Sequence, residues 1–462
     1  MPLYAGISEC NITPPLGVWM SGYAVRSSGA TSVHDYLYAR ALVLDNGARR
    51  VVVVAADIIA FPPMCVARIR EGIATQLHTT PDAIMLHASH THGGPNLGIY
   101  RCMGEPDRAY RDVFERMVIG AAVMAAQRLQ PVHLSYGESP AQIGVNRRQA
   151  LPFHRVQLGA DYAGPVAPAV QTLCVNRANG DLLALLFLHA CHPTTMMGEN
   201  LAFTGDWCGA ANERLKRRFR EEGECNAIAE EALPFSLQGC CGDINPYWRP
   251  GWDAVAAHGK AIADAAHQAR WNAQRRLSDS LEAEERMLEL PLLPPPSREE
   301  CDKILAECER ESEQDRAAKV PLGRLLFREG QVAWAKDYRV YAEQSPFKET
   351  QTFAIQHFSL GGIHLLGFPA EMFVQYQLDF SRQCASPVLS LGYTNGCWNY
   401  LPTTAEYARG GYEVNDAFKY YGTLMLAPES ETLVREATYS LLGVEEPDTT
   451  PYPLLAGPSR PL

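Results

Sequence analysis

The sequence predicts an α/β fold in which a mixed β-sheet core is flanked by helices and carries a charged helical-hairpin insertion. Through the first half of the chain, short apolar runs that are typical of buried strands alternate with longer segments of helical periodicity. Residues 297–344 are rich in Glu, Lys and Arg at helical spacing and are broken near Pro321-Leu-Gly323. The first pattern predicts the layered core, and the second predicts the hairpin.

The individual elements follow from apolar spacing and from turn residues. The run Val51–Ala56 ends at Asp57, and another short apolar run leads into His87, so both are expected to be buried strands. Dense proline at residues 288–296 forbids helix and central strand, which predicts an extended connector. In chain order, strands are expected at 51–56, 83–87, 182–188, 352–359 and 363–366, and helices at 64–78, 107–129, 206–222 and about 371–384.

The chain is expected to form one main domain that is interrupted by an insertion. Residues 1–288 and 345–445 make up the domain, and residues 289–344 supply the proline linker and the helical insertion. Residues 446–462 contain several prolines and are expected to be an irregular tail.

The composition indicates a soluble protein and disfavours two classes of partner. The formal net charge is -11 and the pI is about 5.7, which argues against nucleic acid. No apolar run reaches the roughly 18 residues that span a bilayer, and the N-terminus lacks the features of a secretory signal. The 13 cysteines include no C-x-x-C pair and are expected to be reduced. We therefore expect a cytoplasmic protein with a small-molecule substrate and no stable membrane insertion, and a homo-oligomer stays open.

The most informative segment is His87-Ala-Ser-His90-Thr-His92-Gly-Gly-Pro-Asn96, which follows a short apolar strand. His90 and His92 are two residues apart, so on an extended chain both rings point to the same face. Neutral imidazole is the commonest metal-ligating side chain, so the cluster predicts a metal or catalytic site. The alternative is a set of structural histidines that cap the end of the strand.

A second strand also ends in a histidine motif, His189-Ala-Cys-His192-Pro-Thr-Thr-Met196. Pro193 holds His192 in an extended conformation. A lone histidine in this position is more often structural than functional. Two strands that each end in histidine favour a shared site.

Three later segments add candidate polar groups. Asp243, beside Gly242, could orient a ligand histidine, and an Asx turn is the alternative reading. Glu371, at a strand–helix junction, stands where a carboxylate ligand could be placed, although the helix dipole alone would also favour it. The tyrosine-dense segment from Tyr393 to Tyr412 is too polar and too rich in glycine for a pure core.

In their order and wording, these segments resemble the neutral/alkaline, non-lysosomal ceramidase family, zinc amidases that cleave the amide of N-acyl sphingosine. The resemblance spans most of residues 4–425, and it implies a common fold and amide hydrolysis. Its further motifs are Ala5-Gly-Ile-Ser-Glu-Cys-Asn-Ile-Thr-Pro-Pro15, Ser21-Gly22-Tyr23-Ala24, Leu37-Tyr-Ala-Arg-Ala41 and the pair Asn146-Arg147.

The resemblance also implies a site, residue by residue. The implied ligands of one Zn²⁺ are His90, His192, Glu371 and Tyr400. His92 is implied to face the substrate, and Gly22 falls where a backbone group lines the same pocket. The residues implied around the scissile amide are Arg147 and Tyr412.

Asn245 stands where the family has the serine of its Gly-Asp-x-Ser-Pro segment, a residue with a catalytic or substrate-contacting part. Asparagine cannot act as a hydroxyl nucleophile, so a route through metal-activated water is expected, with Asn245 hydrogen-bonding the substrate. The 297–344 insertion shows no apolar stripe that would face a membrane, and the chain leaves no room for the family's C-terminal immunoglobulin-like domain. A small or moderately polar N-acyl substrate is therefore expected in place of ceramide.

The sequence thus predicts a zinc-dependent hydrolase that cleaves the amide bond of an N-acyl substrate. Two catalytic alternatives stay open: a zinc esterase or lactonase with the same ligands, and a metal-assisted lyase on a polar, sugar-like substrate. A non-catalytic binding protein that kept the pocket is the third alternative. The nitrogen and oxygen ligands would also accept manganese, iron or nickel.

Overall fold

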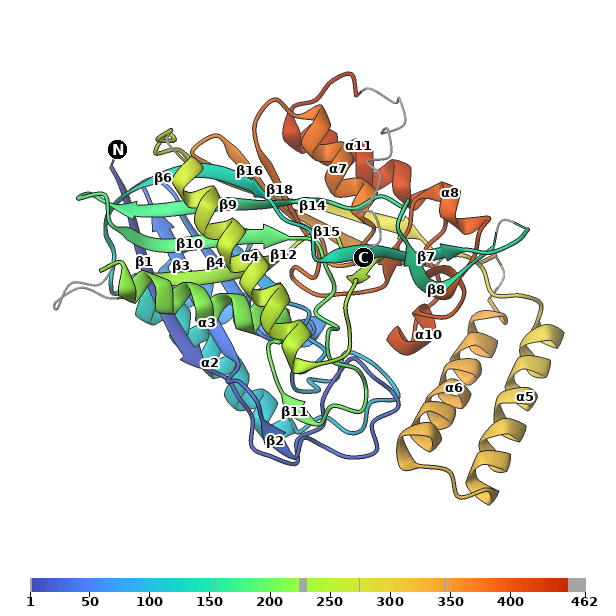
Figure 1. Ribbon diagram of the computed structural model, residues 1–462. Coiled ribbons are helices and arrows are strands. Elements are labelled where there is room, and N and C mark those ends of the chain that lie inside the picture. Colours follow the sequence, from blue (N-terminus) through green and yellow to red (C-terminus); the bar gives the residue numbers. More distant parts are fainter. Residues whose placement is uncertain are drawn as a thin grey trace.

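Two β-sheets pack face to face at the centre of the computed structural model, and helices cover the outer face of each sheet (Figure 1). The structure describes residues 2–153, 155–223, 231–273, 275–344, 346–347 and 349–447. The predicted α/β class, with mixed sheets and flanking helices, is confirmed.

The larger sheet has eight strands in the order β12-β10-β9-β6-β1-β3-β4-β5. The pairs β4/β5 and β10/β12 are parallel, whereas the other neighbours are antiparallel. Alternate residues of a strand pack into two different hydrophobic cores: Val52 and Val54 face the helices, whereas Val51 and Val53 face the second sheet. Because both faces of the strand are buried, its sequence is an unbroken apolar run. The strands are β1 (Leu3–Asn11), β3 (Tyr38–Asp45), β4 (Arg50–Ala56), β5 (Ile84–Ala88), β6 (Gln130–Pro140), β9 (Ala169–Arg177), β10 (Leu182–His189) and β12 (Leu233–Gln238).

Four helices cover the outer face of this sheet with apolar side chains. Asp107 caps one of them, because its side chain accepts a hydrogen bond from the Tyr110 backbone N–H at 2.9 Å. The predicted helices at 64–78, 107–129 and 206–222 are confirmed to within three residues at each end. The helices are α1 (Pro63–Leu77), α2 (Arg108–Ala126), α3 (Asp206–Glu221) and α4 (Trp252–Asn272).

The smaller sheet has the order β14-β15-β16-β18 and is covered on its outer face by two helices. The predicted connector at 288–296 begins as a strand, because β14 continues to Pro291. β14 is an edge strand, where a residue without a backbone N–H is tolerated. The elements are β14 (Leu281–Pro291), β15 (Thr350–Leu360), β16 (Ile363–Gly367), β18 (Val388–Leu391), α7 (Val374–Gln383) and α11 (Ser430–Leu442).

The helix expected from about residue 371 begins only at Val374, so the placement of Glu371 in its first turn was wrong. Glu371 instead belongs to the two-residue strand β17 (Glu371–Met372), which pairs in parallel with β19 (Tyr400–Leu401). The Glu371 backbone N–H donates to the Asn399 carbonyl at 2.9 Å. This pairing with a segment 29 residues away in the register Glu371↔Tyr400 keeps the residue extended.

The charged hairpin is present as α5 (Arg298–Ala317) and α6 (Leu322–Tyr341), two helices that lie side by side and extend away from the sheets (Figure 1). Ser297 and Glu300 form a reciprocal capping box at its start. No helix among the described residues is long and apolar enough to cross a membrane. The domain boundaries remain a prediction, and residues 448–462 of the expected tail lie outside the described residues.

Short elements gather where β5, β10 and β16 end, and they carry much of the candidate site. Among them, the three strands β13-β7-β8 form a small sheet. These elements are β2 (Ser32–Val33), β7 (Gly144–Ala150), β8 (Val156–Asp161), β11 (Ala202–Phe203), β13 (Ile244–Pro246), α8 (Thr404–Tyr407), α9 (Tyr412–Asn415) and α10 (Phe418–Tyr421). The short 3₁₀ helix η1 (Pro81–Ala83) instead lies at the start of β5.

Candidate active site

Segments that follow three strands bring two histidines and a carboxylate together. His90 follows β5, His192 follows β10, and Glu371 follows β16. Each of these strands pairs in parallel with a neighbour, in the pairs β4/β5, β10/β12 and β16/β18. The three side chains follow the carboxyl ends of these parallel strands, where functional groups of α/β proteins commonly lie. The Glu371 Oε2 atom lies 3.0 Å from His192 Nε2 and 3.5 Å from His90 Nε2.

The backbone fixes the orientation of both imidazoles. His90 Nδ1 lies 2.8 Å from the Ile59 carbonyl, and His192 Nδ1 lies 2.6 Å from the Cys241 carbonyl. A ring whose Nδ1–H donates to a carbonyl presents the lone pair of Nε2, which is the usual arrangement of a metal-ligating histidine. Burial, with the nearby Arg147, lowers the pKa of His192 to about 4, so the ring is neutral at neutral pH.

Two tyrosines hold the Glu371 carboxylate. The Tyr393 hydroxyl donates to Oε2 at 3.4 Å, and the Tyr421 hydroxyl donates to Oε1. The Tyr393 ring also stacks on His90, with 3.8 Å between ring centroids. Tyr393 opened the tyrosine-dense segment noted in the sequence, whereas nothing in the sequence singled out Tyr421.

His92 differs from the other two histidines because neither of its ring nitrogens has a hydrogen-bond partner among the described residues. Its ring centroid lies 5.1 Å from that of His90 and 5.9 Å from that of His192. Burial, together with the two neighbouring imidazoles, holds the pKa of His92 well below its ordinary value. His92 is therefore neutral at neutral pH and has nitrogens available to a molecule in the pocket.

Gly22 permits this placement of His92. Its φ is +101°, and a Cβ atom there would lie 2.4 Å from the Cγ and Nδ1 atoms of the His92 ring. Only glycine combines this backbone conformation with so close an approach.

Gly22→Ala is expected to lower kcat/KM on the order of a hundredfold, because a small displacement of a reacting group has an effect of this size. Gly17→Ala is the matched control: Gly17 has a φ of +92°, but a Cβ there would meet nothing within 4 Å. Both variants carry a similar backbone strain of about 1 kcal/mol. Steady-state kinetics and thermal unfolding of the pair separate the clash from the strain, and equal activities would refute the role given to Gly22.

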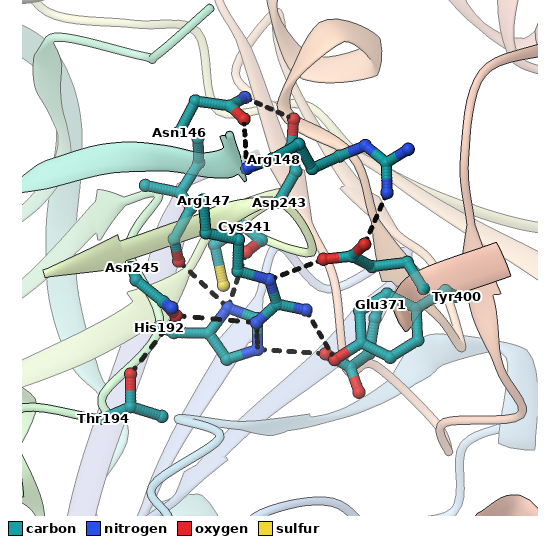
Figure 2. Close-up of polar contacts among 12 residues, drawn as sticks. Asn146, Arg147, Arg148, His192, Thr194, Cys241, Asp243, Asn245, Glu371 and Tyr400 are labelled. Atoms are coloured by element: carbon teal, nitrogen blue, oxygen red, sulfur yellow. Dashed lines mark hydrogen bonds and ion pairs between the residues drawn. The ribbon is translucent and has the colours of Figure 1, made fainter. Parts of the chain in front are cut away.

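Arg147 lies directly beside His192 and Tyr400, two of the implied metal ligands. Figure 2 shows its guanidinium beside His192, turned toward Tyr400. Its Nη2 donates to the Tyr400 hydroxyl at 3.0 Å, and its Nη1 lies 3.5 Å from Asn245 Oδ1. The buried Glu413 accepts from Arg147 Nε at 2.7 Å and also pairs with Arg148. The pairs hold the Arg147 side chain in one orientation.

These groups line a cavity of about 520 Å³. Apart from Glu371, its charged lining residues are arginines, and most of the remaining walls are apolar or aromatic. Besides the groups already described, the lining includes Tyr23, Val25, Ile59, Tyr100, Met103, Leu158, Met197, Arg249, Arg324, Phe327, Tyr412 and Tyr420.

The structure brings the four implied metal ligands and the four residues implied to contact the substrate to this cavity or its wall. The latter four are His92, Arg147, Asn245 and Tyr412. Seven line it directly, and His192 lies against Glu371 and Arg147 at its edge. The sequence had suggested that Asp243 orients a ligand histidine, but no histidine among the described residues hydrogen-bonds its carboxylate. Its carboxylate accepts from the Val374 N–H and from Asn146, and burial raises its pKa to about 7.

The donor atoms fit a metal ion in two ways. One ring nitrogen from each of His90, His92 and His192 lies within 4.8 Å of the others. The alternative set replaces His92 by Glu371, whose Oε2 approaches both of the other histidines. His90 Nε2 is buried and makes no hydrogen bond among the described residues, as expected of an atom that faces an ion. The fixed orientations of His90 and His192, which His92 lacks, favour the set with Glu371.

This fold and this pocket belong to a hydrolase that acts on an amide bond. More particularly, the chain belongs to the neutral/alkaline non-lysosomal ceramidase family, whose N-terminal family model matches residues 4–260, over half of the chain. The resemblance seen in the sequence is thereby confirmed.

Relatives of the chain include a neutral ceramidase from Pseudomonas aeruginosa, 24% identical over 472 residues that cover 89% of this chain and 68% of the relative. The crystal structure of neutral ceramidase from Pseudomonas aeruginosa superposes with a TM-score of 0.70 and 21% identity, covering 96% of this chain and 74% of that one. A ceramidase complexed with C2 gives a TM-score of 0.71 and 19% identity, covering 98% and 77%. These structural likenesses show a shared fold.

Proposed function

We propose that the chain is a zinc-dependent amidase that hydrolyses an N-acyl substrate by means of metal-activated water. The observation that carries this proposal is the convergence of His90 Nε2, His192 Nε2 and Glu371 Oε2 at the wall of a cavity whose lining is mostly apolar and aromatic. Family membership makes amide hydrolysis the reaction, and the donor set of nitrogen and oxygen atoms suits Zn²⁺.

His90, His192 and Glu371 would hold the ion, and Tyr400 would complete the set. Bound Zn²⁺ would supply Lewis acidity and lower the pKa of coordinated water. The Tyr400 hydroxyl is buried and accepts from Arg147, and burial raises its pKa well above the ordinary value while Arg147 opposes the shift. Arg147 therefore favours the ionised form of Tyr400, which a metal ligand requires.

His92 would handle the protons of the reaction. Its ring lines the same pocket, and its nitrogens have no hydrogen-bond partner in the described part of the chain, so it can accept a proton during attack on the carbonyl and return it to the departing amine. A neutral ring at neutral pH is the form that accepts the first proton.

Arg147 and Tyr412 would stabilise the negative charge that develops on the carbonyl oxygen. Arg147 is held by Glu413, and no described side chain hydrogen-bonds the Tyr412 hydroxyl, which lines the pocket. Preorganised donors of this kind stabilise an oxyanion because they need not reorganise during the reaction. Asn245, beside Thr194, would hydrogen-bond the substrate where the family has serine.

The relatives are ceramidases by name, which supports an N-acyl amine as the substrate class. The apolar walls of the cavity support an acyl group as the part of the substrate that enters it. The cytoplasmic location and the homo-oligomer remain predictions.

The test is a panel of matched N-octanoyl amides and octanoyl esters, incubated with the zinc-loaded protein and analysed by mass spectrometry. We expect amide cleavage with the gain of one water and loss of activity on chelation, restored by Zn²⁺. Faster turnover of every ester than of its amide would favour the esterase or lactonase, and products without added water would favour the lyase. An absence of turnover across the panel would contradict the proposal.

A further inference from the structure

The candidate pocket is positively charged within a protein of net charge -11. Three arginines line it, against one carboxylate, Glu371, which lies among the proposed metal ligands. Two of the arginines already have carboxylate partners: Arg147 pairs with Glu413, and Arg324 pairs with Asp315 at 2.8 Å. A cation at the metal site would make the pocket more positive still.

Arg249 is the exception among the three. Among the described residues, no hydrogen bond or ion pair involves its side chain, although it lines the same cavity as His90 and His92. Its charge acts on Tyr23, where it opposes the rise in pKa that burial causes. Two acidic residues also act on Tyr23, and neither lines the cavity: Asp206, whose carboxylate accepts from the Met196 and Trp207 backbone N–H groups, and the exposed Glu199.

The backbone is anchored at the two residues that precede Arg249. Asn245 lies in β13, and the segment after β13 leads through Arg249 into α4. The Tyr247 N–H donates to the Ile143 carbonyl at 3.0 Å, and the Trp248 carbonyl lies 2.9 Å from His258 Nε2. Arg249 is therefore presented from an anchored segment that also supplies a proposed substrate contact.

We propose that Arg249 binds an acidic group, a carboxylate or sulfonate, on the amine portion of the substrate. A guanidinium recognises such groups through paired charge-assisted hydrogen bonds. The acyl portion suits the apolar walls formed by Met103, Met197 and Phe327, so the charge belongs to the amine that departs. This inference rests on the proposed amidase function and narrows its substrate to N-acyl amino acids and their sulfonate counterparts.

Binding to the zinc-loaded protein tests the inference without requiring turnover. The probes are octylsulfonylglycine, whose sulfonamide replaces the scissile amide, its taurine counterpart, and the neutral octylsulfonylglycinamide. We expect calorimetry to give both acids an affinity about ten- to a hundredfold above that of the neutral probe, as for a hydrogen bond to a charged group. Preference for only one acid would assign the site to that acid, and equal affinity for all three would overturn the inference.

Variants assign the preference to one residue. Arg249→Gln is expected to abolish it, and Arg249→Glu to transfer it to the cationic probe octylsulfonyl-ethylenediamine, a reversal that misfolding cannot produce. Arg116→Gln, on the exposed face of α2, is the control that keeps the preference. If Arg324→Gln removes the preference and Arg249→Gln does not, the inference is wrong.

Turnover of the matched amides is measured separately. Hydrolysis of octanoylglycine and octanoylglycinamide at equal kcat/KM, together with equal binding of the probes, would leave the amidase function standing and refute the role of Arg249. Acid-selective binding without hydrolysis of either amide would support the role of Arg249 and refute the amidase function.

Discussion

His192→Ala is expected to lose bound zinc and to lower kcat/KM by more than about a thousandfold, equivalent to roughly 4 kcal/mol of transition-state stabilisation. The reason is geometric: His192 Nε2 lies 3.0 Å from Glu371 Oε2 and its ring is fixed by the Cys241 carbonyl. Plasma mass spectrometry gives the zinc content, and circular dichroism checks that the variant is folded.

His189→Asn is the matched control for this result. His189 is a buried histidine three residues earlier that lies 3.1 Å from the Ala169 carbonyl and does not line the pocket. The control is expected to keep its zinc. Full activity of a zinc-free His192→Ala variant would refute the proposed mechanism.

His92→Ala decides between the two ligand sets. If Glu371 is the third ligand, this variant keeps its zinc and loses turnover, because only the proton-handling group is gone. Loss of zinc from His92→Ala, with zinc retained in Glu371→Gln, would instead assign the ion to the three histidines.

Glu413→Ala is expected to lower the free energy of unfolding by about 3–5 kcal/mol, because it leaves two buried guanidinium groups without a shared partner. The side chains of Glu413, Arg147 and Arg148 are exposed by only 1%, 6% and 3%. Urea denaturation followed by fluorescence measures the change. Glu406→Ala is the control, with an expected loss of about 1–2 kcal/mol, since Arg148 keeps Glu413 as a partner.

The ion pairs of Glu413 with Arg147 and Arg148 make the stability of the protein depend on pH, and the sign of this dependence follows from the pKa of Glu413. Burial would raise the pKa of Glu413, but Arg147 and Arg148 outweigh burial and hold it below its ordinary 4.5. A carboxylate with a lowered folded-state pKa contributes stability above its unfolded pKa and loses it as the pH falls through the folded value. The stability difference between the wild type and Glu413→Gln should therefore shrink below pH 4.5, and a difference that grows there would contradict this account.

Local patterns predict the histidines of this site better than its carboxylate. His90 and His192 each follow an apolar run long enough to define a strand, so their position at strand ends is readable from neighbouring residues. Glu371 was placed in a helix because its local sequence permits one. The pairing of β17 with β19, which decides the matter, depends on residues far along the chain.

The residues that hold the site in place, such as Glu413 and Tyr421, are harder to predict from the sequence. Nothing adjacent to Arg147 indicates that Glu413 pairs with it across 266 positions, or that Tyr421 reaches Glu371. The fold class and the hairpin were readable because periodicity and composition are local. Most contacts that orient the site join segments that lie far apart in the sequence, so they become visible only in the folded chain.

The residues of the candidate site come from segments that follow two different sheets, so a metal ion bound there would also join these two parts of the structure. His90 and His192 follow strands of the larger sheet, whereas Glu371 and Tyr400 belong to segments that follow strands of the smaller one. An ion held by all four would act as a cross-link between halves of the protein that are far apart in the sequence. At a free concentration a hundredfold above its Kd, such an ion would add about 2.7 kcal/mol to stability. Chelation would then loosen the junction between the sheets as well as stop turnover.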